Sequence, residues 1–311
     1  MKLLPQGLWP VMLTPFNDRN GLDLPALEQL TEFYISAGAN GLFANCLSSE
    51  MFQLTDEERL LITKTVVDTA KGRLPVIATG SFGNDMDVSA TFIKRIYDTG
   101  VKAVVISTSQ PCDEFESDDV FKLQMEALLE KTGDIPLGLY ECPVPYKRLL
   151  LPAIIKWLAH TNRFVFHKDT SCDLTEIKRK LEAIEGTPLG FYNAHVPTGV
   201  ASIISGARGL SPISANLYPE LLSYLLSTLK KEGKTEKLEG LNRSLDMMDS
   251  IIHNNYPYTA KLFLKERGLK IQPNCRISRS PMQVQDIKKM ETIRNVFNQL
   301  VAELGIEIVR F

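Results

Sequence analysis

The chain has almost no net charge and lacks a long apolar run. Its 311 residues contain 35 Lys and Arg against 37 Asp and Glu, which gives a formal net charge of −2. Such a chain exerts no broad electrostatic attraction on nucleic acid or on an anionic membrane. It also has no run of the roughly 18 apolar residues that a membrane span requires. Because Pro5, Pro10 and Pro15 interrupt the apolar N-terminus, a signal peptide is not expected. We predict neither a nucleic-acid partner nor a membrane partner.

Paired cysteines are missing as well. The five cysteines are an odd number at wide spacings, and no two of them form a Cys-x-x-Cys pair. A disulfide framework is therefore not expected, and a reducing cytoplasm is the expected location. Four of the cysteines lie near the ends of apolar runs and are interpreted as small apolar fillers rather than as a thiol cluster. These four are Cys46, Cys112, Cys142 and Cys172.

The sequence does contain a regular alternation of short apolar runs and longer amphipathic stretches. The runs carry little charge and often open after Gly or Pro, as do the strands of a parallel sheet that is buried on both faces. Successive runs begin about 20 to 35 residues apart, which is the length of one strand–helix unit. The eight runs cover residues 8–13, 41–46, 75–79, 103–106, 137–140, 164–166, 189–192 and 209–213.

Helix signals fill the stretches between these runs. The segment from Asp23 to Gly38 has a capping aspartate, an early proline and a terminal glycine. Thr55 and Glu58 form a capping box. Eight strands, each followed by a helix, predict an α/β fold of the (β/α)8 TIM-barrel type. A doubly wound sheet would normally carry a glycine-rich phosphate turn, which this chain lacks. We expect a barrel that carries the active site over residues 1–231, and a C-terminal helical region over residues 232–311 that packs on it.

Lys168 is the most informative residue at the end of a predicted strand. Alternation along residues 164–168 places Phe164, Phe166 and Lys168 on the face that points into the barrel. An amine in an apolar interior has a lowered pKa, and a neutral amine is a nucleophile toward ketones. The alternative is a surface lysine just past the strand. Tyr140 ends the preceding strand and could move protons during imine chemistry, although a rim tyrosine with a satisfied hydroxyl is the more common case.

The histidines do not predict a metal site. The same alternation turns His167 away from the barrel interior, toward the helices. His195 has no acidic or histidine partner at the spacing of metal ligands.

Several segments, in order along the chain, resemble one family, the dihydrodipicolinate synthase and N-acetylneuraminate lyase family of class I, Schiff-base aldolases. The tyrosine motif Leu139-Tyr140 with Pro143 and the lysine motif His167-Lys168-Asp169-Thr170-Ser171 are similar to those of the family. The remaining similar segments are residues 13–16, 41–50, 75–80, 206–211 and 280–282. Together they cover nearly the whole chain.

The resemblance implies a barrel with a three-helix C-terminal part and a homo-oligomer, either a dimer or a tetramer. It also implies that Lys168 forms the imine with a 2-oxo acid and that Tyr140 transfers protons. No metal or external cofactor is then needed, because the protonated imine is itself the electron sink. We expect the substrate to be bound at the strand ends by Ser48, Ser49, Asn193 and Ser211.

Departures from the family pattern indicate a divergent member. Leu47 stands where the family has one of two hydroxyl residues, and Ser49 replaces a glycine. The tyrosine pair expected after the fourth strand is absent from residues 109–112, and the arginine expected after the tyrosine motif aligns near Pro145. These departures predict that the chain is not itself a dihydrodipicolinate synthase and that its second substrate differs.

The most favoured function is a class I aldolase acting on pyruvate or a related 2-oxo acid. Two alternatives stay open, namely a dehydratase of a 2-keto-3-deoxy sugar acid that uses the same imine, and a non-catalytic barrel that binds a keto acid. We expect the far end of the substrate to contact side chains that follow the fifth and seventh strands. These are Glu141, Lys147, Arg148, Asn193 and His195.

Overall fold

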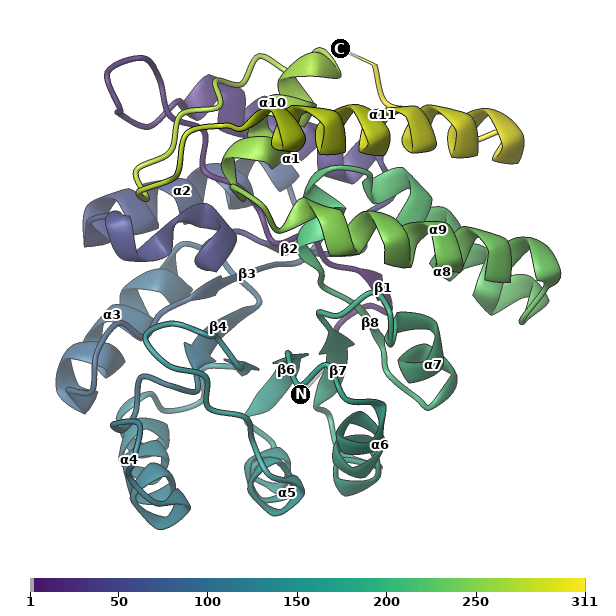
Figure 1. Ribbon diagram of the computed structural model, residues 1–311. Helices are drawn as coiled ribbons and strands as arrows, with labels where there is room; N and C mark the ends of the chain where they lie inside the picture. The colour runs from purple at the N-terminus through teal and green to yellow at the C-terminus, as the bar shows by residue number, and fades with distance from the viewer. Residues whose placement is uncertain (1–2, 311) are drawn as a thin grey trace.

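Eight parallel strands form one curled sheet in the computed structural model, which describes residues 3–310 (Figure 1). The strands follow the order β1-β8-β7-β6-β5-β4-β3-β2, and a parallel bridge between Val11 and Phe43 joins the two edges. The predicted TIM barrel is therefore confirmed. The strands are β1 (Gly7–Leu8), β2 (Leu42–Phe43), β3 (Val76–Thr79), β4 (Ala103–Ser107), β5 (Leu137–Tyr140), β6 (Phe164–Asp169), β7 (Gly190–Asn193) and β8 (Gly209–Leu210).

Helices surround the strands, as Figure 1 shows. The sequence signals that predicted their starts are present as hydrogen bonds. Asp23 accepts from the backbone N–H of Ala26, while Thr55 and Glu58 form a complete capping box. The helices of the barrel are α1 (Leu24–Ser36), α2 (Asp56–Ala70), α3 (Met86–Asp98), α4 (Asp118–Lys131), α5 (Pro152–His160), α6 (Leu174–Ala183), α7 (Gly199–Ile204) and α8 (Pro219–Glu232).

The strands at the seam of the barrel are shorter than the sequence predicts. Regular pairing in β1 stops at Leu8, although the apolar run continues to residue 13. The reason is Pro10, which has no N–H to donate to a sheet ladder. Its carbonyl instead accepts from Phe43 N at 3.0 Å, and Met12 N donates to Phe43 O at 3.0 Å. The chain therefore closes the barrel through single hydrogen bonds rather than through a continuous ladder.

Aromatic rings fill the interior of the barrel. Trp9, Phe43, Phe166 and Tyr192 pack together, and the Phe166 and Tyr192 rings stack with their centroids 4.5 Å apart. Lys168 lies two residues beyond Phe166 on β6, so strand alternation places its side chain directly above this aromatic layer. The layer excludes water from below the lysine.

The C-terminal region consists of α9 (Glu236–Ile252), α10 (Tyr258–Glu266) and α11 (Val284–Leu304). In Figure 1, α9 and α11 lie side by side along one edge of the barrel. The buried ion pair between Lys261 Nζ and Glu50 Oε1, at 2.7 Å, joins α10 to the segment that follows β2. Helix α8 ends at Glu232, so the division expected after residue 231 falls at a helix end, and the division into two domains stays a prediction.

No helix in the described part of the chain is both long enough and apolar enough to cross a membrane. All five cysteines are free in this structure.

Candidate active site

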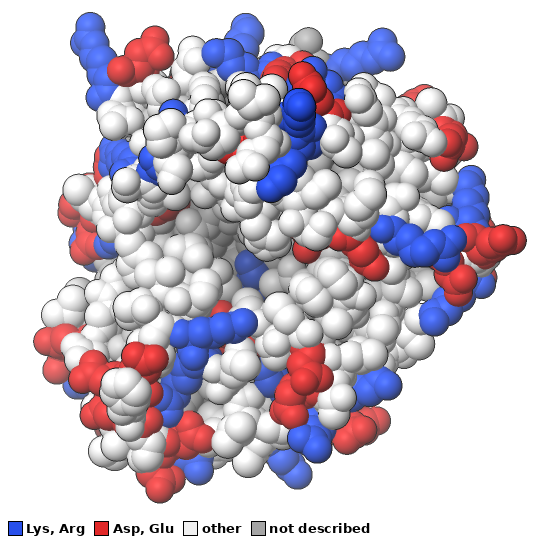
Figure 2. Space-filling view, in the orientation of Figure 1, with Lys and Arg blue, Asp and Glu red and all other residues white. Residues whose placement is uncertain are grey.

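A cavity of about 560 Å³ lies where the strands of the barrel end. Its barrel side is lined by residues that follow β2, β5, β6, β7 and β8, and Lys168 and Tyr140 are among its walls. Figure 2 shows a hollow near the centre of the molecule, with a basic side chain visible inside it. The C-terminal region supplies the opposite wall through Asp249, His253, Tyr256, Pro257 and Ile277.

Lys168 is the central basic group of this cavity. It pairs in register with Tyr140 of β5 and Tyr192 of β7, and only 4% of its surface is exposed. Burial lowers the pKa of the Lys168 amine from 10.5 to about 8. At pH 7 about a tenth of such an amine is neutral, against about 0.03% at the ordinary pKa. The amine can therefore act as a nucleophile near neutral pH.

Tyr140 lies beside the lysine. The Lys168 Nζ atom is 4.7 Å from the centroid of the Tyr140 ring. Burial, together with the nearby Cys142 and Cys46, raises the pKa of Tyr140 well above its usual value, so the phenol keeps its proton. Burial raises the pKa of both thiols too, which agrees with their interpretation as uncharged fillers. Tyr140 is thus a neutral proton donor next to the amine.

Ser48 accepts a hydrogen bond from Tyr256, a residue that the sequence does not single out. Tyr256, between α9 and α10, donates its hydroxyl to Ser48 Oγ at 2.7 Å, and Asn216 Nδ2 donates to the Tyr256 hydroxyl at 2.6 Å. Both Ser48 and Tyr256 line the cavity. Tyr256 lies almost 90 residues after Lys168, in a region whose pattern reads only as helix, and nothing in its spacing indicates a place in the barrel mouth.

Three other predicted substrate-binding residues use their side chains elsewhere, so their direct role is not supported. Ser49 Oγ donates to Met12 O at 2.7 Å, and Ser211 Oγ donates to Trp9 O at 2.8 Å. Asn193 Nδ2 donates to Thr198 Oγ1 at 2.9 Å. All three predicted residues are fully buried behind the cavity wall. Their side chains hold the backbone at the strand ends. A residue type alone does not show whether a side chain has this role or binds substrate.

Of the residues expected to contact the far end of the substrate, some line the cavity and others do not. Lys147 and His195 line the cavity. Arg148 instead pairs with Asp118 at 2.9 Å, on the outside of the barrel mouth. The prediction for Glu141 is wrong, because its fully buried carboxylate lies behind the sheet.

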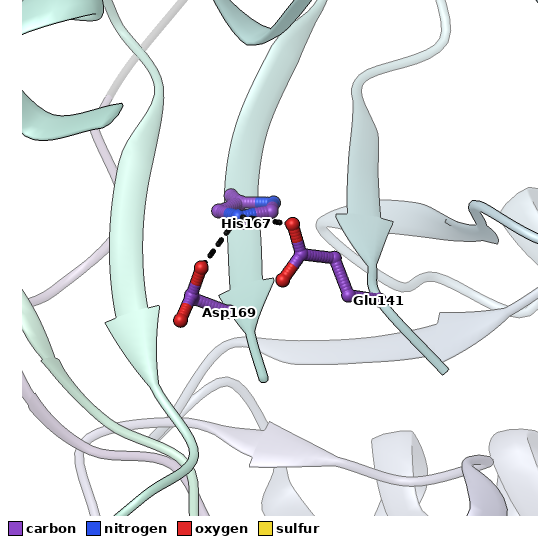
Figure 3. Close-up of side chains that lie close together, drawn as sticks. All are labelled: Glu141, His167 and Asp169. Atoms are coloured by element: carbon purple, nitrogen blue, oxygen red, sulfur yellow. Dashed lines mark ion pairs between the residues drawn. The ribbon is translucent and has the colours of Figure 1, made fainter. Parts of the chain in front are cut away.

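A buried cluster of charged groups lies behind β5 and β6, on the side away from the cavity. Figure 3 shows the His167 ring between the Glu141 and Asp169 carboxylates, with Nε2 3.8 Å from an oxygen of each. Lys180 of α6 reaches the same place, and its Nζ atom lies 2.5 Å from Glu141 and 2.6 Å from Asp169. His167 thus faces the helices, as alternation predicts. The cluster fixes the residues that adjoin Tyr140 and Lys168 in the chain.

Glu141, His167 and Asp169 form a group of three possible metal ligands, which the sequence spacing did not reveal. The Lys180 ammonium already lies between the two carboxylates and supplies the positive charge there. Burial alone would raise the pKa of Asp169, but the neighbouring His167 and Lys180 hold it well below its usual range. We therefore interpret the group as an ion cluster of the chain itself and propose no metal for it.

Comparisons with known proteins agree over nearly the whole chain. The sequence model of the Dihydrodipicolinate synthetase family matches residues 4–300. The chain is 27% identical over 299 residues to 4-hydroxy-tetrahydrodipicolinate synthase 1 of Halalkalibacterium halodurans, covering 94% of this chain and 97% of that protein. It is 29% identical over 276 residues to the 4-hydroxy-tetrahydrodipicolinate synthase of Methylococcus capsulatus, covering 88% and 91%.

Solved structures show the same fold. The dihydrodipicolinate synthase of Acinetobacter baumannii, solved with pyruvate bound, matches with a TM-score of 0.84 at 24% identity. The match covers 94% of this chain and 99% of that chain.

The buried cluster gives a stability prediction. Lys180→Met should lower the free energy of unfolding by about 3–5 kcal/mol, because it leaves two buried carboxylates without their cation. Lys178→Met, on the exposed face of the same helix, is the control and should stay within about 0.5 kcal/mol of wild type. Urea denaturation followed by circular dichroism measures both. Equal stability of the two variants would show that Lys180 does not compensate the carboxylates.

Proposed function

Because the chain belongs to the dihydrodipicolinate synthetase family, we propose that it is a Schiff-base-forming lyase acting on pyruvate or a related 2-oxo acid. Its most favoured activity is that of a class I aldolase. The observation that carries this proposal is Lys168, a buried amine with a pKa of about 8 at the base of a cavity. The only covalent partner of the substrate is this lysine, and the reaction needs no metal or external cofactor.

In the proposed reaction, the neutral Lys168 amine attacks the ketone carbon of the 2-oxo acid. Loss of water then gives an imine that carries a proton and a positive charge. When the bond between the third and fourth carbons breaks, its electron pair moves into this imine as an enamine, and the hydroxyl proton of the fourth carbon leaves as the aldehyde forms. The Tyr140 phenol supplies and removes protons next to the nitrogen. The enamine then takes up a proton at its third carbon and becomes the imine of pyruvate. Hydrolysis of this imine releases pyruvate and frees the lysine.

The substrate carboxylate is proposed to bind at Ser48. Tyr256 donates its only hydroxyl proton to Ser48 Oγ, so the Ser48 proton is free to point into the cavity toward a carboxylate oxygen. Leu47, at the position where the family has a hydroxyl, cannot do this. The phenol of Tyr256 therefore supplies a hydroxyl contact at this site, where Leu47 replaces one of the two hydroxyl residues of the family.

The two alternatives to an aldolase, a dehydratase and a non-catalytic sensor, differ from it in the product formed or in forming none. The same imine could expel a hydroxyl from a 2-keto-3-deoxy sugar acid, which yields a new oxo acid and no aldehyde. A non-catalytic keto-acid sensor would not need the lowered pKa of Lys168 or the adjacent phenol, and both features favour an enzyme.

We also propose a homo-oligomer in the cytoplasm. The apolar side chains of Val88 on α3, Leu123 on α4 and Phe115 just before α4 are exposed, Phe115 to 95%. Helices α3 and α4 are neighbours, so a second copy of the chain could cover these side chains together.

The proposed imine predicts covalent trapping at Lys168. Borohydride reduction with pyruvate should add the mass of the reduced ligand to the peptide that contains Lys168, and not to the peptide with Lys147. The rate of labelling should rise with pH and level off above about 8, because only the neutral amine attacks. Mass spectrometry of the digested protein measures both. Equal labelling of Lys168→Ala would remove this residue from the mechanism.

The proposed role of Tyr140 predicts a defect in proton transfer. Tyr140→Phe should slow the exchange of the pyruvate methyl protons with deuterated water by about 10²–10⁴-fold, because a positioned acid or base contributes that much. Trapping at Lys168 should fall far less, since the ring and its packing stay. Proton magnetic resonance follows the exchange without knowledge of the second substrate. An exchange rate within about threefold of wild type would contradict the role.

The departures from the family pattern predict poor dihydrodipicolinate synthase activity, although the relatives above carry that name. With pyruvate and aspartate semialdehyde, kcat/KM should stay below about 10⁴ M⁻¹s⁻¹, the lower end of efficient enzymes. The reasons are Leu47, the missing tyrosine pair and the absence of an arginine at Pro145. A coupled assay tests this, and efficient turnover would show that the departures do not set the second substrate.

A further inference from the structure

The cavity is much larger than pyruvate. Pyruvate has six non-hydrogen atoms and occupies on the order of 100 Å³, the space of three or four water molecules. The cavity has about 560 Å³, and it extends from Lys168 to a second polar group of side chains. This distal group consists of Lys147 and His195 from the barrel, and Asp249 and His253 from α9 and the residue that follows it.

Asp249 is the unusual member of the distal group. Only 5% of its surface is exposed, and its Oδ1 atom is shielded from solvent and has no hydrogen-bond partner among the described residues. Its Oδ2 atom lies 3.8 Å from His253 Nε2, which is beyond a good hydrogen bond. A carboxylate removed from water without full pairing destabilises the fold. Because Asp249 also lines the cavity, its incompletely paired carboxylate points to a ligand that donates a hydrogen bond to it.

We propose that Asp249 is a substrate-binding residue, which accepts a hydrogen bond from a hydroxyl group on the far part of an extended 2-oxo acid. The proposal rests on the proposed imine at Lys168, because that imine holds the near end of the substrate at the opposite end of the cavity. It assigns a specificity role to the C-terminal region, whose helices lie outside the barrel.

The chemistry of the distal group selects an uncharged hydroxylated tail. Asp249 repels a carboxylate or phosphate, and an apolar tail would leave its carboxylate without a hydrogen-bond donor. Lys147 opposes an ammonium group, and the Asp249 carboxylate raises the pKa of His253 above its usual value. Hydroxyl groups satisfy both kinds of partner, since each can donate to the Asp249 carboxylate and accept from the Lys147 ammonium.

The neighbouring elements leave room for this contact. Burial lowers the pKa of His195, so its ring stays neutral beside Asp249, and His195 Nδ1 lies 3.1 Å from Thr198 Oγ1. Lys147 Nζ donates to the Thr170 carbonyl across the cavity rim. Both barrel residues are held by the barrel itself, whereas the buried Asp249 carboxylate is incompletely bonded.

The test compares two six-carbon 2-oxo acids that both carry a 4-hydroxyl. One is a 3-deoxy-2-oxo sugar acid with hydroxyls at carbons 5 and 6, and the other is 4-hydroxy-2-oxohexanoate, which lacks them. The half-saturating concentration for borohydride labelling of Lys168 measures uptake of each. Wild type should favour the hydroxylated acid by about 10–100-fold, the range of a hydrogen bond to a charged group. Asp249→Leu should reduce this ratio to within about threefold of one.

Asp246→Asn is the matched control, because Asp246 lies on the same helix, carries the same charge and is not among the cavity residues. It should keep the wild-type ratio. Should Asp249→Leu fail to fold, Asp249→Asn keeps the volume and should lower the ratio by at least threefold through loss of the charge. A wild-type ratio near one, or an unchanged ratio in the Asp249 variants, would overturn the proposal.

A second readout separates this inference from the proposed function. The rise in melting temperature with each acid is measured without borohydride and does not require an imine. If Lys168 is not labelled, the proposed imine is wrong. The difference in melting temperature between the two acids would then still test whether Asp249 binds the distal hydroxyls. Normal labelling with no dependence on the distal hydroxyls would overturn the role of Asp249 alone.

Discussion

The structure depends on one electrostatic constraint, which is that the Lys168 amine must sit where water is scarce. Desolvation lowers its pKa to about 8, while ion pairing with a carboxylate would raise it again. The aromatic layer of Trp9, Phe43, Phe166 and Tyr192 below the lysine meets this requirement, because it fills the barrel without offering a charged partner. The two thiols beside the lysine keep their protons for the same reason and leave the amine as the reactive group.

The carboxylates that would otherwise bind this amine lie on the other face of the same strands. Asp169 and Glu141 follow Lys168 and Tyr140 directly in the chain, and the alternation of β-strands turns them outward. There they bind Lys180 of α6, so each lysine has its own side of the sheet. On the outer face, the two carboxylates and Lys180 join the ends of β5 and β6. On the inner face, Lys168 and Tyr140 line the cavity without a carboxylate partner among the residues that the structure describes. A shift of register by one residue would exchange the two environments and remove the reactive amine.

The sequence predicts those features of the fold and the site that depend on local alternation, and it does not predict those that depend on how distant segments pack. Periodicity gave the barrel, the inward direction of Lys168 and the outward direction of His167, because all three depend on local alternation. It could not separate Ser49, which bonds the backbone, from Ser48, which faces the cavity, since both are hydroxyls at one strand end. Tyr256 was missed because its position depends on how a distant segment packs on the barrel, and no local pattern records that packing.

The division of the cavity between the barrel and the C-terminal helices has a consequence for motion. A molecule held between Lys168 and the wall made by α9 can stay bound only while α9 remains docked, so its binding free energy adds to the cost of local opening of that helix. Occupancy of the cavity should therefore slow amide hydrogen exchange in α9–α11, which begin at Glu236, far along the chain from the reactive lysine. Helices that lie outside the barrel would then report, through their exchange rates, whether the barrel is filled.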